Sequence, residues 1–134
     1  MVLNPDCVRD ILLEVESLGF DECLTINLLH ERLPVYSSDQ LEYTCLMLED
    51  GGFLELITIE TLGRNLPGVK LIQCLTYKGH EFLANVHKDD IWAGVKSVSS
   101  KIGSASLSAL TQIASNVISE IIKAQFGLSS PGAV

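Results

Sequence analysis

A helix followed directly by a β-hairpin is the feature of this sequence that most restricts its fold. Ser37 and Gln40 have the spacing of a capping box and predict a helix over 38–50, which two glycines end. Two β-rich runs follow, 53–59 and 69–75, and the nine residues between them include two glycines and a proline. Runs joined by such a turn pair as antiparallel strands. The sequence therefore predicts a mixed α+β fold.

Helices are predicted on both sides of this segment. Asn4 is a favourable N-cap, and apolar residues then recur at helical spacing over 5–18. Residues 24–28 alternate between apolar and polar, which favours a short strand, although 28–32 could also form a helical turn. The helices predicted after the hairpin begin at Thr76, at the Asp89-Asp90 pair and at Ser106, the last of them running to Phe126.

Length and composition limit the organisation of the chain. With 134 residues, 47% hydrophobic and 19% charged, the chain can bury a core and is not expected to be disordered. We expect a first domain over 1–86, a C-terminal helical extension over 87–127 and a loose tail over 128–134. The N-terminus lacks a signal-peptide pattern, and no apolar run reaches the roughly 18 residues of a membrane span. We therefore expect a cytoplasmic protein without membrane contact.

The sequence offers little support for catalysis. Its four cysteines include no closely spaced pair and are each flanked by apolar residues, so we expect them to be buried and reduced rather than metal ligands. The three histidines have no evident nucleophile partner, and no glycine-rich phosphate loop is present. We expect no enzyme activity, and we predict no catalytic, cofactor-binding or metal residues.

Two stretches resemble a known fold. Residues 40–54 resemble the recognition helix and following turn of winged-helix regulators, and Leu75-Thr76-Tyr77-Lys78-Gly79 resembles the start of their next helix. The chain also resembles, over about 3–127, a family of small uncharacterised proteins of bacteria and their phages. The shared motifs are Pro5 to Leu13, Leu75 to Leu83 and Asp90 to Lys96. The resemblance implies a winged helix-turn-helix domain with extra C-terminal helices, but neither an activity nor a functional residue.

Negative charge on the first half of the chain bears on what such a domain could bind. Residues 1–60 hold two bases and 13 acids, a net charge of 2 − 13 = −11. A recognition helix that enters the major groove presents Arg, Lys, Asn or Gln, and here only Gln40 and Tyr43 are suitable. The acids would repel phosphate and could instead bind a basic protein, although they could also simply keep an exposed helix soluble. The predicted partner-binding residues are Asp39, Gln40, Glu42, Tyr43, Glu49 and Asp50.

The hairpin is more favourable to DNA. Arg64 and Asn65 lie at its predicted tip, and Lys70 lies at the start of the returning strand. These residues could contact phosphates or the minor groove, or they could belong to an ordinary solvated turn. Nucleic acid is therefore a possible partner through the hairpin.

The last predicted helix has an apolar arc wider than a single contact requires. Some of its residues fit the a and d positions of a coiled coil, which predicts a homodimer. Packing within one chain is the alternative, and membrane contact is disfavoured because the helix lacks the usual basic residues. The residues predicted at the dimer interface are Leu107, Leu110, Ala114, Val117 and Ile121.

Together these features favour a non-enzymatic winged-helix binding protein of phage or mobile-element type. We expect it to act by protein–protein interaction through its acidic face, as an inhibitor, antitoxin-like or anti-defence factor. The alternative is a transcriptional regulator that contacts DNA through the wing.

Overall fold

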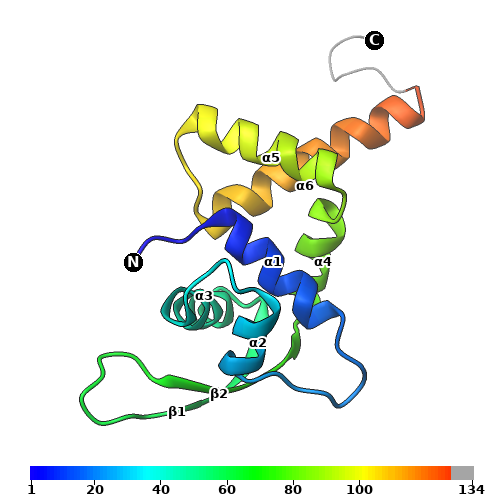
Figure 1. Ribbon diagram of the computed structural model, residues 1–134. Coiled ribbons are helices and arrows are strands. Elements are labelled where there is room, and N and C mark those ends of the chain that lie inside the picture. Colours follow the sequence, from blue (N-terminus) through cyan, green and yellow to red (C-terminus); the bar gives the residue numbers. More distant parts are fainter. Residues whose placement is uncertain (128–134) are drawn as a thin grey trace. The chain divides into compact units, whose positions relative to one another are not determined.

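The computed structural model describes residues 1–127 as six α-helices and one two-stranded antiparallel sheet, an α+β fold (Figure 1). In chain order the elements are α1 (Pro5–Glu16), α2 (Ile26–Arg32), α3 (Ser38–Asp50), β1 (Leu54–Ile59), β2 (Gly68–Leu75), α4 (Tyr77–Val86), α5 (Asp89–Ile102) and α6 (Leu107–Gln125). The predicted hairpin and the helices predicted on both sides of it are confirmed. The predicted tail, 128–134, lies outside the described residues.

The chain divides into two compact units. The first unit ends at Leu83 and the second unit begins at Ala84, so the division falls inside α4. The sequence placed a domain boundary at residue 86, three residues further on.

The segment after α1 differs from the prediction. The strand favoured over 24–28 is wrong, because only Leu24 makes a β-bridge, to Ile72, with N···O distances of 2.9 and 2.7 Å. Thr25 ends this extended stretch by capping α2, since its Oγ1 accepts a hydrogen bond from Leu28 N at 3.2 Å. The apolar alternation resembled a strand, but a capping threonine in its middle begins a helix.

Helix caps account for most of the other boundaries. Ser37 Oγ accepts from Gln40 N (3.1 Å) at the start of α3, as the capping box predicts. Helix α5 begins at Asp89 as predicted, but the interpretation of the Asp89-Asp90 pair as its cap is wrong, because Lys88 is the N-cap residue and both acids lie in the first turn. Carboxylates in the first turn still interact favourably with the positive end of the helix dipole. The two acids therefore mark the start of the helix, although the cap itself lies one residue earlier.

The core of the first unit is built on α3. The predicted stripe of Leu41, Cys45 and Leu48 is fully buried. Helices α1 and α2 and both strands pack against α3. Phe53, just before β1, stacks on Phe82 with ring centroids 5.4 Å apart. The hairpin extends from this core, and its far end is exposed (Figure 1).

The start of α4 fits closely against the end of α3. Thr76 Oγ1 donates to Gly52 O and accepts from Gly79 N, which caps the helix as predicted. Gly79 itself leaves no room for a side chain, because a Cβ there would lie 2.2 Å from the carbonyl oxygen of Phe53. The Leu-Thr-x-x-Gly motif therefore has a packing reason in this chain.

The second unit is a helical hairpin. Helices α5 and α6 pack on each other, and Gly103 ends α5 in the left-handed conformation (φ +75°). Trp92 and Val95 of α5 and Leu110 of α6 are buried. No helix in the described part of the chain is long and apolar enough to cross a membrane.

Candidate functional site

The predicted acidic face of α3 is only partly open to solvent. Asp39 and Asp50, at its two ends, are exposed. The other four predicted partner-binding residues are half-buried: Gln40, Glu42, Tyr43 and Glu49. A protein that docked on this helix would meet exposed acids only at the ends.

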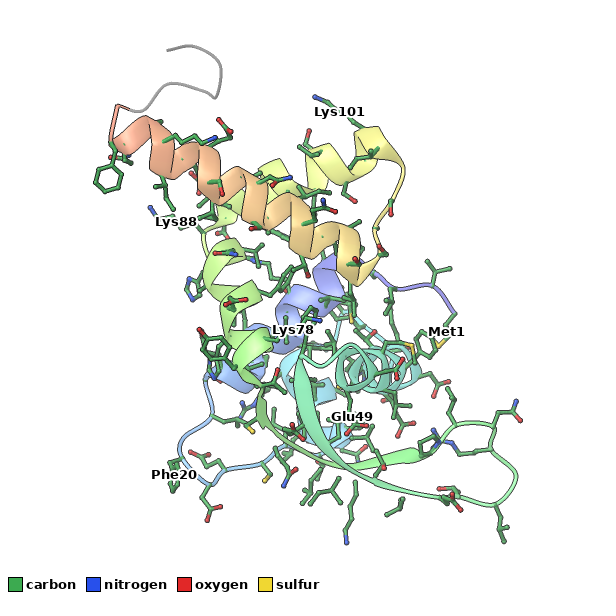
Figure 2. All side chains as sticks on the ribbon, turned by 180° about the vertical axis from the view of Figure 1, so that it is seen from behind. Met1, Phe20, Glu49, Lys78, Lys88 and Lys101 are labelled. Atoms are coloured by element: carbon green, nitrogen blue, oxygen red, sulfur yellow. The ribbon has the colours of Figure 1, made fainter. Side chains whose placement is uncertain are left out.

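Glu42 joins α3 to the hairpin loop and to β2. One carboxylate oxygen, Oε1, lies 2.6 Å from Arg64 Nη2, and the other accepts a hydrogen bond from Val69 N at 3.0 Å. Glu49 makes a similar link nearer the core, because its Oε2 accepts from Leu56 N at 3.2 Å (Glu49 is labelled in Figure 2). Two acids that the sequence assigned to partner binding therefore hold the hairpin against α3.

The predicted DNA-contacting residues of the hairpin differ in their surroundings. Asn65 and Lys70 are exposed, and Asn65 and Arg64 line a hollow of about 340 Å³ in the loop. Arg64 is the residue paired with Glu42, and its side chain is still 42% exposed. Beyond the hairpin, Lys78 Nζ donates to Gly51 O (3.1 Å) and lies 5.1 Å from the centre of the Phe53 ring. Two of the basic side chains near the hairpin thus make contacts within the chain.

The net charge of the first unit is strongly negative. Residues 1–83 hold five bases and 14 acids, which gives 5 − 14 = −9. Of the bases near the hairpin, Arg64 is paired with Glu42. A surface of this charge repels a phosphate backbone and attracts a basic protein.

The cysteines fall into two pairs, which corrects the expectation that all four are buried. Cys7 and Cys45 are buried, and burial raises the pKa of both thiols, which keeps them protonated. Cys23 and Cys74 are exposed. Cys23 lies in the segment before the Leu24 bridge, and Cys74 follows the exposed Gln73 on β2, so local apolar sequence did not imply burial.

Metal binding finds no geometric support in the described residues. No group of three or more His, Cys, Asp or Glu side chains among residues 1–127 is arranged to hold a metal ion.

The residues of α6 that were predicted at the dimer interface are partly buried and partly exposed. Leu110 and Ala114 are fully buried, Leu107 and Val117 are half-buried, and Ile121 is exposed. Val117 and Ile121 line an apolar groove of about 570 Å³ together with Val98 and Ile102 of α5. Leu110 and Ala114, in the middle of the predicted interface, are therefore not accessible to a second copy in this conformation.

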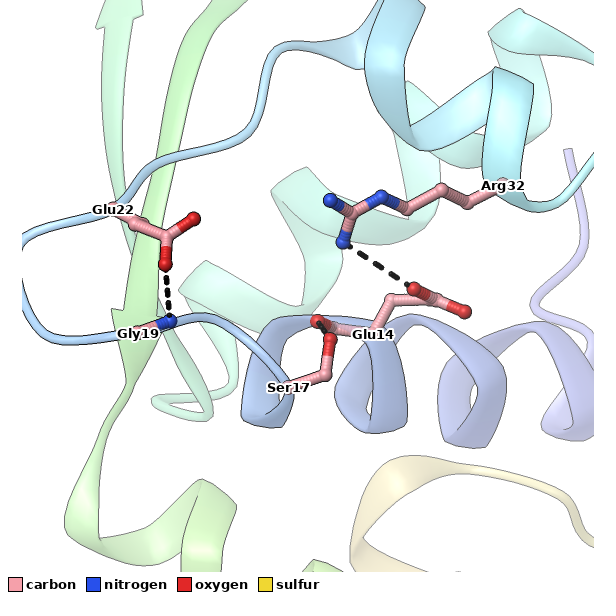
Figure 3. Close-up of polar contacts among 5 residues, drawn as sticks. All are labelled: Glu14, Ser17, Gly19, Glu22 and Arg32. Carbon is pink, nitrogen blue, oxygen red and sulfur yellow. Dashed lines mark hydrogen bonds and ion pairs between the residues drawn. The ribbon is translucent and has the colours of Figure 1, made fainter.

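A pocket of about 520 Å³ in the first unit was missed by the sequence analysis. It is lined by the end of α1, the turn that follows, the end of β2 and His80 of α4. The exposed Cys23 and Cys74 both border it, as does Phe20, whose side chain is completely exposed. The sequence feature that could have indicated it is Phe20, an aromatic residue beside two acids in the turn after α1 (Figure 3). Hydrophobic periodicity does not place this residue in a helix or a strand.

Comparison with known proteins gives a family but no activity. Residues 2–106 match the model of a hypothetical-protein family, DUF2513. An uncharacterized protein of Haemophilus influenzae is 31% identical over 123 residues, which cover 91% of this chain and 99% of that protein. No solved structure matches the chain. The chain therefore belongs to the DUF2513 family of hypothetical proteins.

Proposed function

We propose that this chain is a non-enzymatic binding protein whose first unit is a winged helix-turn-helix that binds a basic protein partner. In this assignment α2 and α3 form the helix-turn-helix and the β1–β2 hairpin is the wing. The order of these elements and the capped α3 support it. A role of phage or mobile-element type, as an inhibitor, antitoxin-like or anti-defence factor, is part of the proposal and rests on the family resemblance.

The observation that carries the proposal is the contact between Glu42 and the hairpin. A wing that grips DNA needs its arginine free to meet phosphate, and here the arginine of the loop lies 2.6 Å from a carboxylate of the preceding helix. DNA binding would have to break this ion pair inside a unit of charge −9. A basic protein partner would need no such rearrangement.

A DNA-binding regulator is the second candidate. Lys70 and Asn65 are exposed on the hairpin, and Gln40 and Tyr43 are half-exposed on α3. If the Glu42–Arg64 pair opened, these residues could face a duplex together with Arg64. The pair would then act as an electrostatic barrier to DNA binding rather than as a permanent contact.

Homodimerisation through the second unit is also part of the proposal. The α5–α6 groove exposes apolar side chains, of which Ile102 is 62% and Val98 40% exposed. The second unit holds four bases and three acids among its described residues, so its charge is 4 − 3 = +1. Two copies could approach through this unit without the repulsion that two first units would experience.

The proposal is tested by capture from a bacterial lysate, with one arm treated with nuclease and the other untreated. The immobilised protein should retain the same proteins in both arms, and moderate salt should release them because acidic contacts are screened. A matched column carrying the Asp39→Lys, Asp50→Lys variant shows whether the ends of α3 take part. Retention that disappears in the nuclease arm would favour the DNA-binding candidate instead.

A further inference from the structure

Helices α5 and α6 leave an open apolar groove along one side of the second unit. The two helices lie side by side (Figure 1), and the groove between them has a volume of about 570 Å³. Its α5 wall is made by Val98 and Ile102, which are 40% and 62% exposed. A groove between two packed helices is the surface on which a further helix packs in a bundle.

The α6 side of the groove consists of two rows of residues, each with a spacing of four. One row is apolar and forms the floor: Ala109, Ile113, Val117 and Ile121. The other row is polar and exposed along its whole length, and it forms the rim: Gln112, Asn116 and Glu120. Residues four apart on a helix lie about 6 Å apart on one face, so the rim spans about 12 Å with Asn116 at its centre.

The rim is complementary to its own copy turned end to end. A two-fold axis that crosses α6 at Asn116 exchanges Gln112 and Glu120, because each lies four residues from Asn116. The Gln112 amide is then placed to donate a hydrogen bond to the partner's Glu120, and the two Asn116 amides can pair because each has a donor and an acceptor. A parallel arrangement would instead bring the two Glu120 carboxylates together, which like-charge repulsion opposes.

Glu120 is available for this contact. Its Oε1 lies 3.5 Å from Lys123 Nζ, and its side chain is still 69% exposed, so the carboxylate can accept a further hydrogen bond. Glu120 is also the one charged side chain among the described residues that line the groove. A basic partner of the kind that suits the first unit would find a single carboxylate here, already paired with Lys123. A second copy fits this neutral groove better.

The open face of α6 differs from the dimer interface predicted from the sequence. That interface included Leu110 and Ala114, which are fully buried within the chain. On the groove side, intervals of four, three and four residues separate Ala109, Ile113, Asn116 and Glu120. These are the intervals of a coiled-coil contact, in which a single asparagine fixes register and orientation at a cost in stability.

We propose that a second copy closes the groove in antiparallel orientation, with the two-fold axis at Asn116 and with Gln112 of each copy bound to Glu120 of the other. Asn116 then fixes the register of the two α6 helices. The inference rests on the homodimer of the proposed function and specifies how its two copies meet. Each rim is incomplete without the other copy, because the hydrogen-bond donor for Glu120 comes from the partner.

The arrangement is tested by cysteine cross-linking in the full chain. The two exposed cysteines, Cys23 and Cys74, are first replaced by Ser, and the buried Cys7 and Cys45 are kept. One new cysteine is then introduced on the rim, and disulfides are formed with copper phenanthroline as the oxidant.

The pattern of cross-links reports the orientation. Asn116→Cys should link to its own copy, because the axis passes through this position. Gln112→Cys and Glu120→Cys, one of them carrying an enlarged tag, are mixed and should link to each other at least about fivefold faster than either links to itself, because a disulfide forms only between closely placed Cβ atoms.

A matched pair of variants shows whether the cross-links come from the groove. Ile121 and Ile122 are neighbours on α6 with side chains 38% and 48% exposed, and only Ile121 lines the groove. In the Asn116→Cys background, Ile121→Asp should slow cross-linking about tenfold because association would bury its carboxylate. Ile122→Asp should leave the rate unchanged. Circular dichroism checks that both variants remain folded.

Two results would overturn the proposal. Faster linking of Glu120→Cys to itself than to Gln112→Cys would show parallel helices, and equal effects of the two Asp variants would place the contact outside the groove. Light scattering on the unmodified protein separates this outcome from that of the proposed dimer. A dimer without the link between positions 112 and 120 refutes this arrangement alone, whereas a monomer refutes both.

Discussion

Removal of the Glu42 carboxylate should destabilise the first unit by an amount that can be divided between its two contacts. The ion pair with Arg64 is partly exposed, with side chains 42% and 18% accessible, so it is worth about 0.5–1 kcal/mol. The second contact matters more, because Val69 is only 9% exposed and its N–H would lose its acceptor. An unsatisfied buried N–H costs about 1–3 kcal/mol. Glu42→Ala should therefore lower the free energy of unfolding by about 1.5–4 kcal/mol.

Three further variants separate these contributions. Glu42→Gln keeps an oxygen for Val69 N but loses the ion pair, so it should cost less than about 1 kcal/mol. Arg64→Ala removes the same ion pair and should cost a similar amount. Glu60→Ala, an exposed acid of the same loop, is the control and should stay within about 0.5 kcal/mol of the unmodified protein.

The assay is urea denaturation followed by circular dichroism at neutral pH, with the midpoint and slope fitted for each variant. If Glu42→Ala costs no more than Glu60→Ala, the two contacts do not hold the hairpin. If Glu42→Gln costs as much as Glu42→Ala, the division between ion pair and backbone contact is wrong.

Three other features of the structure lead to predictions. Burial and the Asp10 carboxylate, which accepts a hydrogen bond from the Tyr36 hydroxyl at 2.7 Å, raise the folded pKa of Tyr36 above its ordinary value of 10.0. Below pH 10 the protonated Tyr36 contributes its full stabilisation, and this contribution is lost as the pH rises beyond 10. Tyr36→Phe lacks the ionising hydroxyl, so its free energy of unfolding, measured by denaturation, should fall less steeply at alkaline pH. Gly79→Ala should lower the free energy of unfolding by about 2 kcal/mol or more, because the added Cβ would collide with Phe53 O. Gly94→Ala, where the Cβ would meet open space on α5, should raise it by about 0.5–1 kcal/mol. Equal shifts of the melting temperature in the two variants would contradict this. Light scattering at tens of micromolar should find a dimer that Val117→Asp and Ile121→Asp convert to a folded monomer, and an unmodified protein that is already monomeric would rule out the groove as a dimer interface.

Local signals in the sequence predicted the elements better than they predicted the surface. Ser37 and Thr76 fixed helix starts because a capping side chain contacts a backbone group only three residues away. The contact of Glu42 with Arg64 joins residues 22 positions apart, and no local pattern indicates it. The exposure of Cys23 and the burial of Leu110 likewise depend on how distant elements pack. For this reason the sequence indicated the acids of α3 but not that two of them bind the hairpin.

The pocket beside Phe20 could not be predicted for a similar reason. It is bordered by the turn after α1 and by the end of β2, which the Leu24–Ile72 bridge brings together. That bridge involves one residue on each side and was obscured by the alternating pattern that suggested a longer strand. The acidic composition of residues 1–60 nevertheless indicated correctly that the first unit would be strongly negative.

The central claim, that the first unit binds protein rather than DNA, is tested most directly by fluorescence anisotropy with labelled DNA duplexes. Fragments flanking the gene of this protein and a random-sequence control are titrated at low salt and at about 150 mM salt. We predict no saturable binding at the higher salt, and at low salt only weak binding that does not distinguish the two kinds of duplex. A nanomolar complex at about 150 mM salt, lost when Gln40 and Tyr43 are both replaced by Ala, would contradict the account and identify α3 as a DNA-reading helix.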